Sequence, residues 1–417
     1  MPGANIPEHT ADLYNLPTSE NSRVKEVFSW VKENSLAITE LQIELAEIGS
    51  PTGKEQARGD MVEKWFRSAG CTVSRDTVGN VLALRNGDEG KPAICVSAHL
   101  DNVFDSTQRV RIIRPGEKNP YANEQVVPAG EYHGPGIADD AAGLAAIIGI
   151  AQAMASSSLT TKKDILFLAT VGEEGKGNLK GSRYFLSSPN GKEISSFITI
   201  DHGDPNVIVN RSIGSRRYSV KFSGPGGHSW NNYGRYNPAI AMALAARNIQ
   251  GINLPKEARS SVNVGVMNSG TSVNAIPESA YMEVDLRSEV HSALTYLDRE
   301  FHKAVENAQE EELKKRPHKN TKLDIFCIGE RPAGETPKTD ALVIAAQDAL
   351  ENEGFQPCFA ASSTDANAAM AVKIPAICIG WGGRSGNQHS RYEYFAPAGR
   401  ERTLAAILRM IIGLART

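Results

Sequence analysis

The stretch "DILFLATVGEEG", residues 164–175, decides how the chain folds. Its first half is apolar almost throughout, which is typical of a strand covered by helices on both faces of a parallel sheet. Its second half sets Glu173 and Glu174 side by side. Neighbouring side chains on an extended segment point in opposite directions, so the two carboxylates are suited to different tasks, or both are solvated loop charges. Residues elsewhere in the chain decide between these interpretations.

Other parts of the chain repeat this apolar pattern and separate it with helical segments. The apolar runs lie at 93–98, 197–200 and 374–380, and the helical segments lie at 141–155, 339–353 and 398–415. Segment 141–155 is apolar nearly all round, which predicts a buried helix. Strands alternating with helices predict an α/β domain with a mostly parallel sheet.

The middle of the chain has a different pattern. In "RRYSVKFSG" and "AYMEVDLRS", apolar and polar residues alternate strictly, and Val262, Val264 and Val266 alternate in the same way. A period of two is typical of an antiparallel sheet with one solvated face.

Helical segments at 237–250 and 291–315 separate these strands. The resulting order β-α-β-β-α-β is that of a ferredoxin-like unit. We therefore expect an inserted α+β domain at 212–325, within a discontinuous catalytic domain made of 1–211 and 326–417.

Composition narrows the class of protein. The chain has 417 residues, a net charge of -3 and no basic block, so we expect no nucleic-acid partner. Residues 1–22 lack the apolar core of a signal peptide, and no stretch is apolar enough to cross a membrane. Five scattered cysteines without a CxxC pair are typical of a reducing compartment. We expect a cytoplasmic protein with a loosely held N-terminal lead.

Metal-binding types of residue gather where the predicted strands end. These residues are His99 and Asp101 after the first run, Glu173 and Glu174, Asp201, Asp139 and Asp140 before the buried helix, and His389 after the last strand. In doubly wound sheets, ligands bind outside the carboxyl ends of the strands. Carboxylates and imidazoles are good zinc ligands, and two ions can share one carboxylate. The pattern predicts a metal site at this edge.

Each of these residues also has an ordinary explanation. Asp139 could cap the helix that follows it, although Asp140 can perform that task instead. Glu174 alone would be a loop charge, and His389 alone would be a surface histidine. His389 is, however, the one histidine after the last apolar run. We expect Asp365 to cap the helix after it rather than to bind metal.

Taken together, five motifs carry a resemblance to a known family. These motifs are "SAHLD", "GPGIADDAAG", "GEEG", "ITID" and "NQHS". Their order and spacing resemble those of the two-zinc metallohydrolases, a family that includes aminoacylase, glutamate carboxypeptidase and peptidase T. Its members are also described as acetylornithine deacetylase/succinyl-diaminopimelate desuccinylase-like proteins. The resemblance covers nearly the whole chain after about residue 35. "GPGGHSW", "NAIP" and "VDLRS" resemble that family's lid and dimerisation domain.

The resemblance implies a role for each residue. Asp139 would bridge two zinc ions, His99 and Asp201 would complete one site, and Glu174 and His389 would complete the other. Asp101 would orient His99, Glu173 would be the general base, and His228 would stabilise the oxyanion from a partner subunit. Arg287 and Asn274 would hold a substrate carboxylate, and Gly382 would let the backbone approach the substrate. The resemblance also implies a cis bond between Asp139 and Asp140.

The function implied is hydrolysis of an amide bond in a short peptide by a zinc-dependent exopeptidase that forms a homodimer through the inserted domain. Cobalt or manganese can occupy such sites as well. An N-acyl amino acid deacylase or carbamoylase would use the same residues. A non-catalytic scaffold or a metal sensor are alternatives of a different class, and a loss of the base or of a ligand would favour them.

Overall fold

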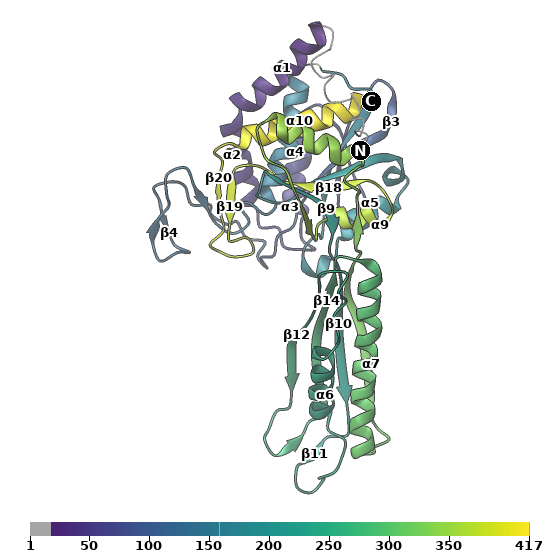
Figure 1. Ribbon diagram of the computed structural model, residues 1–417. Coiled ribbons are helices and arrows are strands. Elements are labelled where there is room, and N and C mark those ends of the chain that lie inside the picture. The colour runs from purple at the N-terminus through teal and green to yellow at the C-terminus, as the bar shows by residue number, and fades with distance from the viewer. Residues whose placement is uncertain (1–17, 158, 417) are drawn as a thin grey trace. The chain divides into compact units, whose positions relative to one another are not determined.

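The computed structural model describes residues 18–157 and 159–416 (Figure 1). Most of the expected N-terminal lead therefore lies outside the described residues. The chain divides into two compact units, of which the first combines Met1–Arg211 with Glu335–Thr417 and the second is Ser212–Gly334. Each unit has its own hydrophobic core.

The first unit is built on one mixed sheet. Its strands are β1 (Thr72–Arg75), β2 (Val81–Arg85), β3 (Gly90–His99), β7 (Lys163–Thr170), β8 (Ile194–Ile200), β9 (Val207–Ser212), β16 (Gly334–Glu335), β17 (Cys358–Ser362) and β18 (Ala376–Ile379). The order is β1-β2-β7-β3-β8-β18-β9-β16, and β17 pairs with β9. The central strands β7, β3, β8 and β18 are parallel, as expected. Strands β2 and β9 join them antiparallel.

Helices cover both faces of this sheet. They are α1 (Thr18–Glu33), α2 (Ser35–Ala46), α3 (Gln56–Ser68), α4 (Ala141–Ser156), α5 (Lys180–Ser187), α8 (Ala341–Asn352), α9 (Ala366–Ala371) and α10 (Arg400–Arg416). Phe167 of β7 packs into a core with α4 and α10. Its neighbours Leu166 and Leu168 pack into a separate core with α5 and α9. A strand that buries both of its faces must be apolar throughout, which explains the run from which the sheet was predicted.

The buried helix α4 starts against the end of β8. A Cβ atom on Gly143 would lie 2.2 Å from the carbonyl oxygen of Ile200 and 2.2 Å from Asp140 Oδ1. The glycine therefore permits a close approach that no larger residue allows. This approach brings the residues before α4 to the residue after β8, which is Asp201.

The second unit has the expected β-α-β-β-α-β order. Its elements are β10 (Gly214–Ser223), β11 (Gly227–His228), α6 (Pro238–Gln250), β12 (Ser260–Ser269), β13 (Ala275–Ile276), β14 (Ser279–Ser288), α7 (His291–Lys315) and β15 (Lys322–Arg331). The main sheet is antiparallel with the order β12-β14-β10-β15, and β11 pairs with β13. The alternating apolar residues of β10 and β14 form a core with α6 and α7.

Two details of the second unit differ from the sequence-based expectation. The boundary expected at 325/326 falls inside β15 and is corrected to 334/335, because β15 pairs with β10 along its length. Val266 does not continue the alternation of the half-buried Val262 and Val264. The register of β12 shifts between Val264 and Val266, so Val266 is turned outward and is exposed.

Two short sheets lie in the loops of the first unit. Strands β4 (Lys118–Asn119) and β5 (Gln125–Val126) form a small ribbon. Strands β6 (Tyr132–His133), β19 (Arg384–Gly386) and β20 (Tyr394–Ala396) form the other sheet, in the order β19-β20-β6. Among the described residues, every helix is too short or too polar to cross a membrane.

Candidate metal centre

The ends of three parallel strands coincide and carry the predicted ligands. His99 of β3 lies opposite Thr170 of β7, and Ser97 of β3 lies opposite Thr199 of β8. The polar residues that end or follow these strands therefore meet at one edge of the sheet, as the sequence predicts.

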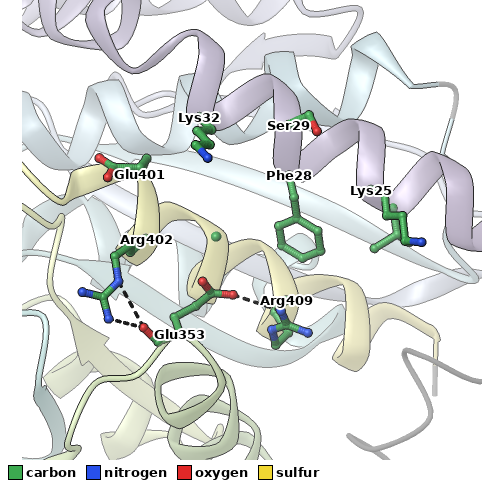
Figure 2. Close-up of a pocket in the computed structure, with 10 residues that line it drawn as sticks. Lys25, Phe28, Ser29, Lys32, Glu353, Glu401, Arg402 and Arg409 are labelled. Carbon is green, nitrogen blue, oxygen red and sulfur yellow. Dashed lines mark hydrogen bonds and ion pairs between the residues drawn. The ribbon is translucent and has the colours of Figure 1, made fainter.

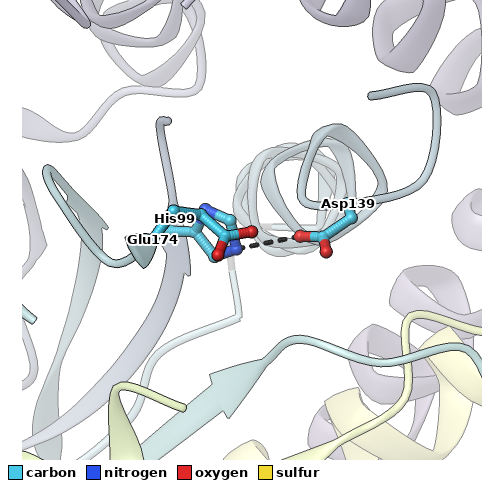
Figure 3. Close-up of side chains that lie close together, drawn as sticks. All are labelled: His99, Asp139 and Glu174. Atoms are coloured by element: carbon cyan, nitrogen blue, oxygen red, sulfur yellow. Dashed lines mark ion pairs between the residues drawn. The ribbon is translucent and has the colours of Figure 1, made fainter. Parts of the chain in front are cut away.

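Asp139 lies between two histidines and presents one oxygen to each. Its Oδ1 is 3.0 Å from His99 Nε2, and its Oδ2 is 3.0 Å from His389 Nε2. Asp201 Oδ1 lies 3.6 Å from His99 Nε2, and Glu174 Oε1 lies 2.9 Å from His389 Nε2. The five residues thus form two overlapping triads that share Asp139. Figure 3 shows His99, Asp139 and Glu174 of this cluster.

The contacts within the cluster fit shared cations better than hydrogen bonds alone. His389 Nε2 can donate at most one proton, yet it lies within 3.0 Å of a carboxylate oxygen from Asp139 and another from Glu174. Asp139 Oδ1 is buried and accepts no well-directed hydrogen bond within the described part of the chain. A buried carboxylate oxygen needs a compensating partner. A divalent cation beside Asp139 would supply it, so the residues present fit metal ions.

Electrostatics in the cluster also favour added positive charge. Hydrogen bonding to Asp139 and Glu174 raises the pKa of His389 to about 10. Burial raises the pKa of Asp201 to about 6. The carboxylates thus hold a proton on the imidazole, and a cation that replaced this proton would leave the histidine neutral, as a ligand must be.

Asp140 performs the capping task that leaves Asp139 available. Its Oδ1 accepts a hydrogen bond from Gly143 N at 3.0 Å at the start of α4, and its Oδ2 accepts one from His99 N at 2.8 Å. Although Asp140 lies near His99 and Asp201, both of its oxygens are thus engaged by backbone. The Asp139–Asp140 bond is cis, as the resemblance implies.

Asp101 organises the site in a different way from the one expected. His99 Nδ1 lies 3.0 Å from the main-chain oxygen of Asp101 and 3.6 Å from its carboxylate. The main-chain oxygen is therefore the closer partner of the imidazole. The carboxylate accepts hydrogen bonds from the N–H groups of Glu173 and Glu174, each at 3.0 Å, and from Thr52 Oγ1 at 2.8 Å. Asp101 thus fixes the backbone of both glutamates.

A buried arginine that gave no sequence signal lies under the cluster. Arg58 is fully buried and donates to the carbonyl oxygens of Leu100 and Ile48, at 3.0 and 2.9 Å. Burial lowers the pKa of its guanidinium to about 10, while the carboxylates of Asp101 and Asp140 act in the opposite sense. Arg58 therefore remains charged and offsets part of the negative charge above it.

The other predicted site residues of the second unit fall into two groups. His228 pairs with Ala275, and Asn274 O accepts a hydrogen bond from Ser229 N at 2.9 Å, so His228 and Asn274 lie close together. Arg287 lies near the opposite end of β14, where it pairs with Ser215.

Arg287 and Asn274 of one chain therefore lie too far apart to hold the same small carboxylate, so their predicted joint role would need one residue from each of two subunits and stays a prediction. Asn274 precedes β13 and β14, whereas Arg287 lies eight residues along β14 from Ser279. At about 3.3 Å a residue, the strand from Ser279 to Arg287 is roughly 26 Å long, and Asn274 comes before its Ser279 end.

Gly382 and Asp365, both in the first unit, lie in packed surroundings. Gly382 has a φ of +77°, and a Cβ there would lie 2.6 Å from Thr403 Cβ, so its missing side chain is explained by packing against α10. Asp365 stands at the N-cap of α9 but makes no capping hydrogen bond. It is buried and instead accepts hydrogen bonds from the hydroxyls of Thr170 and Ser182, so its predicted capping role was wrong.

A cavity of about 670 Å³ in the first unit lies between α1 and α10, next to Glu353 (Figure 2). Lys25, Phe28 and Arg409 are among its lining residues, and none of the residues lining it belongs to the metal-binding cluster. The chemistry of the side chains, rather than the size of a cavity, therefore marks the candidate site.

Two solved peptidase structures share the fold of this chain. A tripeptidase from Staphylococcus aureus superposes with a TM-score of 0.75 at 20% identity, covering 92% of this chain and 99% of the other. Aminopeptidase PepT from Bacillus cereus gives a TM-score of 0.73 at 19% identity, with the same coverage. At these identities the likeness concerns the fold.

Sequence comparison assigns the family. A protein of Aspergillus terreus named "Probable carboxypeptidase" is 24% identical over 269 residues, which span 58% of each chain. The chain thus matches less than two thirds of that relative's length. The model of peptidase family M20/M25/M40 matches residues 95–415, which include all five residues of the cluster. By this match the chain belongs to peptidase family M20/M25/M40.

Proposed function

We propose that the protein is a metal-dependent exopeptidase that hydrolyses a terminal amide bond of short peptides. The observation that carries the proposal is Asp139, whose two oxygens face two different histidine–carboxylate pairs. Membership of a peptidase family supports amide bonds as the target. The name of the Aspergillus terreus relative, "Probable carboxypeptidase", supports a carboxypeptidase in particular.

Two zinc ions are the proposed cofactors. His99, Asp139 and Asp201 would hold one ion, and Asp139, Glu174 and His389 would hold the other. When bound, such ions act as Lewis acids that polarise the amide carbonyl and make water acidic enough to react near neutral pH. Cobalt or manganese would suit the same nitrogen and oxygen ligands.

Glu173 is the proposed general base. It is buried next to Glu174, and Asp101 holds its main-chain N–H. In a water-poor site, its carboxylate would accept a proton from the attacking water and return it to the leaving amine. The two adjacent glutamates would therefore have different roles: Glu174 would bind the metal and Glu173 would transfer the proton.

Arg287 is the proposed partner of a substrate carboxylate. Its Nε donates to Asp285 Oδ2 at 2.7 Å, and Arg217 Nε lies 3.5 Å from the other oxygen of the same aspartate. Two guanidinium groups around one aspartate provide an excess of positive charge. A planar guanidinium fork suits a carboxylate group, so a substrate with a free C-terminus is favoured.

The second unit would act as a lid and as the dimer contact. His228 and Asn274 lie far along the strands from Arg287, so we propose that they reach the site of a partner subunit. His228 would then stabilise the oxyanion. A fully active monomer in light scattering combined with an activity assay would exclude this arrangement.

The direct test is amine release from the metal-loaded protein. Dipeptides and N-acyl amino acids would be compared with the same compounds carrying a C-terminal amide. We expect turnover that chelation abolishes and zinc restores, with a preference for the free acid. Turnover of acyl amino acids alone would point to a deacylase, and metal binding without any turnover would point to a sensor or scaffold. Equal cleavage of the free acid and its amide would show that Arg287 does not bind the substrate carboxylate.

A further inference from the structure

Glu393 is a buried carboxylate in the loop between β19 and β20, four residues after His389. It accepts three hydrogen bonds from a distant segment. Its Oε2 accepts from Gly136 N at 3.0 Å, and its Oε1 accepts from Ala138 N and from Asp139 N, each at 2.8 Å. One side chain therefore holds the backbone that leads into Asp139.

The main chain around Glu393 reinforces this link. Gly134 N donates to the carbonyl oxygen of Glu393 at 2.9 Å, and the next residue, Tyr394, pairs with His133. The segment that carries Asp139 and the loop that carries His389 are thus joined side by side by the pairing of β20 with β6 and by the side chain of Glu393. They are more than 250 positions apart in the chain.

Apart from its contacts with Asp139 and Glu174, the side chain of His389 is only weakly held by its own surroundings. Its side chain is 55% exposed, and its φ of +63° is unusual for a residue with a side chain. Glu393, in contrast, is completely buried. A buried carboxylate with three N–H donors is stabilised only when those donors converge on it, so it fixes the backbone geometry on both sides.

We infer that Glu393 is a positioning residue that sets the separation of Asp139 and His389, and thereby the affinity for the ion those residues share with Glu174. The inference rests on the proposed two-metal function. The other proposed ion would be held by Asp139 together with His99 and Asp201, which lie on β3 and directly after β8. Among the described residues, the Glu393 carboxylate accepts its hydrogen bonds from residues 136–139 and none from β3 or β8. Asp139 serves both proposed ions but His389 serves only one, so loss of the Glu393 side chain should weaken the ion at His389 more than the other.

The test uses Glu393→Ala and Glu393→Gln in the full chain. Alanine removes all three hydrogen bonds. Glutamine keeps one oxygen for Ala138 and Asp139 but turns an NH₂ group toward the N–H of Gly136. Zinc binding would be titrated against a chromophoric chelator, and melting temperatures would be measured for metal-free and zinc-loaded protein.

We expect two zinc ions to bind wild type, and one of them to bind Glu393→Ala roughly tenfold or more weakly, as for other residues that support metal ligands. The rise in melting temperature on zinc addition becomes smaller. Glu393→Gln shows the same effects to a lesser degree. If Glu393→Ala fails to fold, the zinc titration and melting temperatures of Glu393→Gln decide the test.

Glu312→Gln is the matched control. Glu312 is also a fully buried glutamate that accepts a main-chain N–H, from Asn237 at 3.1 Å, but it lies on α7 in the second unit. We expect it to lower the melting temperature equally in metal-free and loaded protein, with unchanged zinc affinities.

The outcomes separate the two hypotheses. If wild type does not bind two ions, the proposed function fails. If wild type binds two ions and both Glu393 variants bind them with wild-type affinities, the positioning role alone is wrong. Equal weakening of both ions, or an unchanged rise in melting temperature on zinc addition, would also overturn it, because a general structural defect has those effects.

Discussion

Glu173 and Glu174 are adjacent, and both are held by Asp101 through their main-chain N–H groups, yet they should respond differently to substitution. We expect Glu173→Gln to lower kcat by about 10²–10⁴-fold, the usual contribution of a general base, while zinc content stays normal. Glu174→Gln should lose zinc, because its carboxylate lies 2.9 Å from His389. Kinetics and metal analysis on the same samples would check both results.

Glu117→Gln, an exposed carboxylate on the loop before β4, serves as the control and should change neither quantity. Full activity in a zinc-loaded Glu173→Gln variant would contradict the assignment of the base.

Arg287 provides a second residue-level prediction. Replacing it with alanine should raise KM for free-acid substrates by roughly 10- to 100-fold, since a hydrogen bond to a charged group contributes about 1.5–3 kcal/mol. The amide substrates should be unaffected. Arg287→Lys should recover only part of the loss, because lysine lacks the planar fork.

Arg299→Ala, on an exposed part of α7, is the control for loss of a positive charge in the same unit. An equal effect of Arg287→Ala on acid and amide substrates would show that Arg287 does not contact the carboxylate.

Single residues differed in how much the sequence revealed. The residues of the metal-binding cluster could be predicted because each follows an apolar run or precedes an apolar helix. Glu393 could not be predicted in the same way, since a glutamate in the polar loop "NQHSRYEY" resembles any surface charge. Arg58 was missed for a related reason, because arginine is seldom fully buried. Both depend on partners far away in the sequence.

At the scale of elements, the start of α4 depends on a glycine. Gly143→Ala would place a Cβ atom 2.2 Å from Ile200 O and from Asp140 Oδ1. Overpacking of this kind costs about 1–3 kcal/mol. We expect a lower free energy of unfolding and weaker zinc binding, because Asp139 and Asp201 would be pushed apart. Denaturant unfolding and zinc titration would measure these changes.

Gly413→Ala is the matched control on another helix. A Cβ on this residue of α10 meets nothing within 4 Å. Alanine favours the helix by about 0.5–1 kcal/mol over glycine, so this variant should be as stable as wild type or more so. A Gly143→Ala protein that was equally stable would disprove the close contact.

The elements of the parallel centre were predicted well, and those at the margins were not. Strands buried on both faces have a continuous apolar signature, which made β3, β7, β8 and β18 visible. The antiparallel strands β1 and β2 are short and only partly buried, so no comparable signal marked them. The bulge in β12 was equally invisible, because a single extra residue changes the register without changing the composition.

On the scale of the whole molecule, the second unit should fold independently. It has its own core, and its two ends meet, since Ser212 Oγ lies 3.2 Å from the carbonyl oxygen of Gly334. We expect a protein of residues 212–334 to give a cooperative unfolding transition and dispersed NMR signals. An unfolded or aggregated product would indicate that the unit needs the remainder of the chain.

The sequence predicted the division into two units because the two kinds of sheet differ in hydrophobic period. It placed the second boundary inside β15, whose apolar residues Phe326 and Ile328 are exposed and carry no signal of where the strand ends. The homodimer remains a prediction that solution measurements must test.

The sharing of Asp139 between two histidines also determines when the site can form as a ribosome makes the protein. His99, Asp139, Glu174 and Asp201 are all synthesised before the second unit, whereas His389 is synthesised after it. A nascent chain that has just completed the second unit therefore carries the ligands of one proposed ion in full and those of the other in part. The second position can be completed only when the chain returns to the first unit and supplies His389.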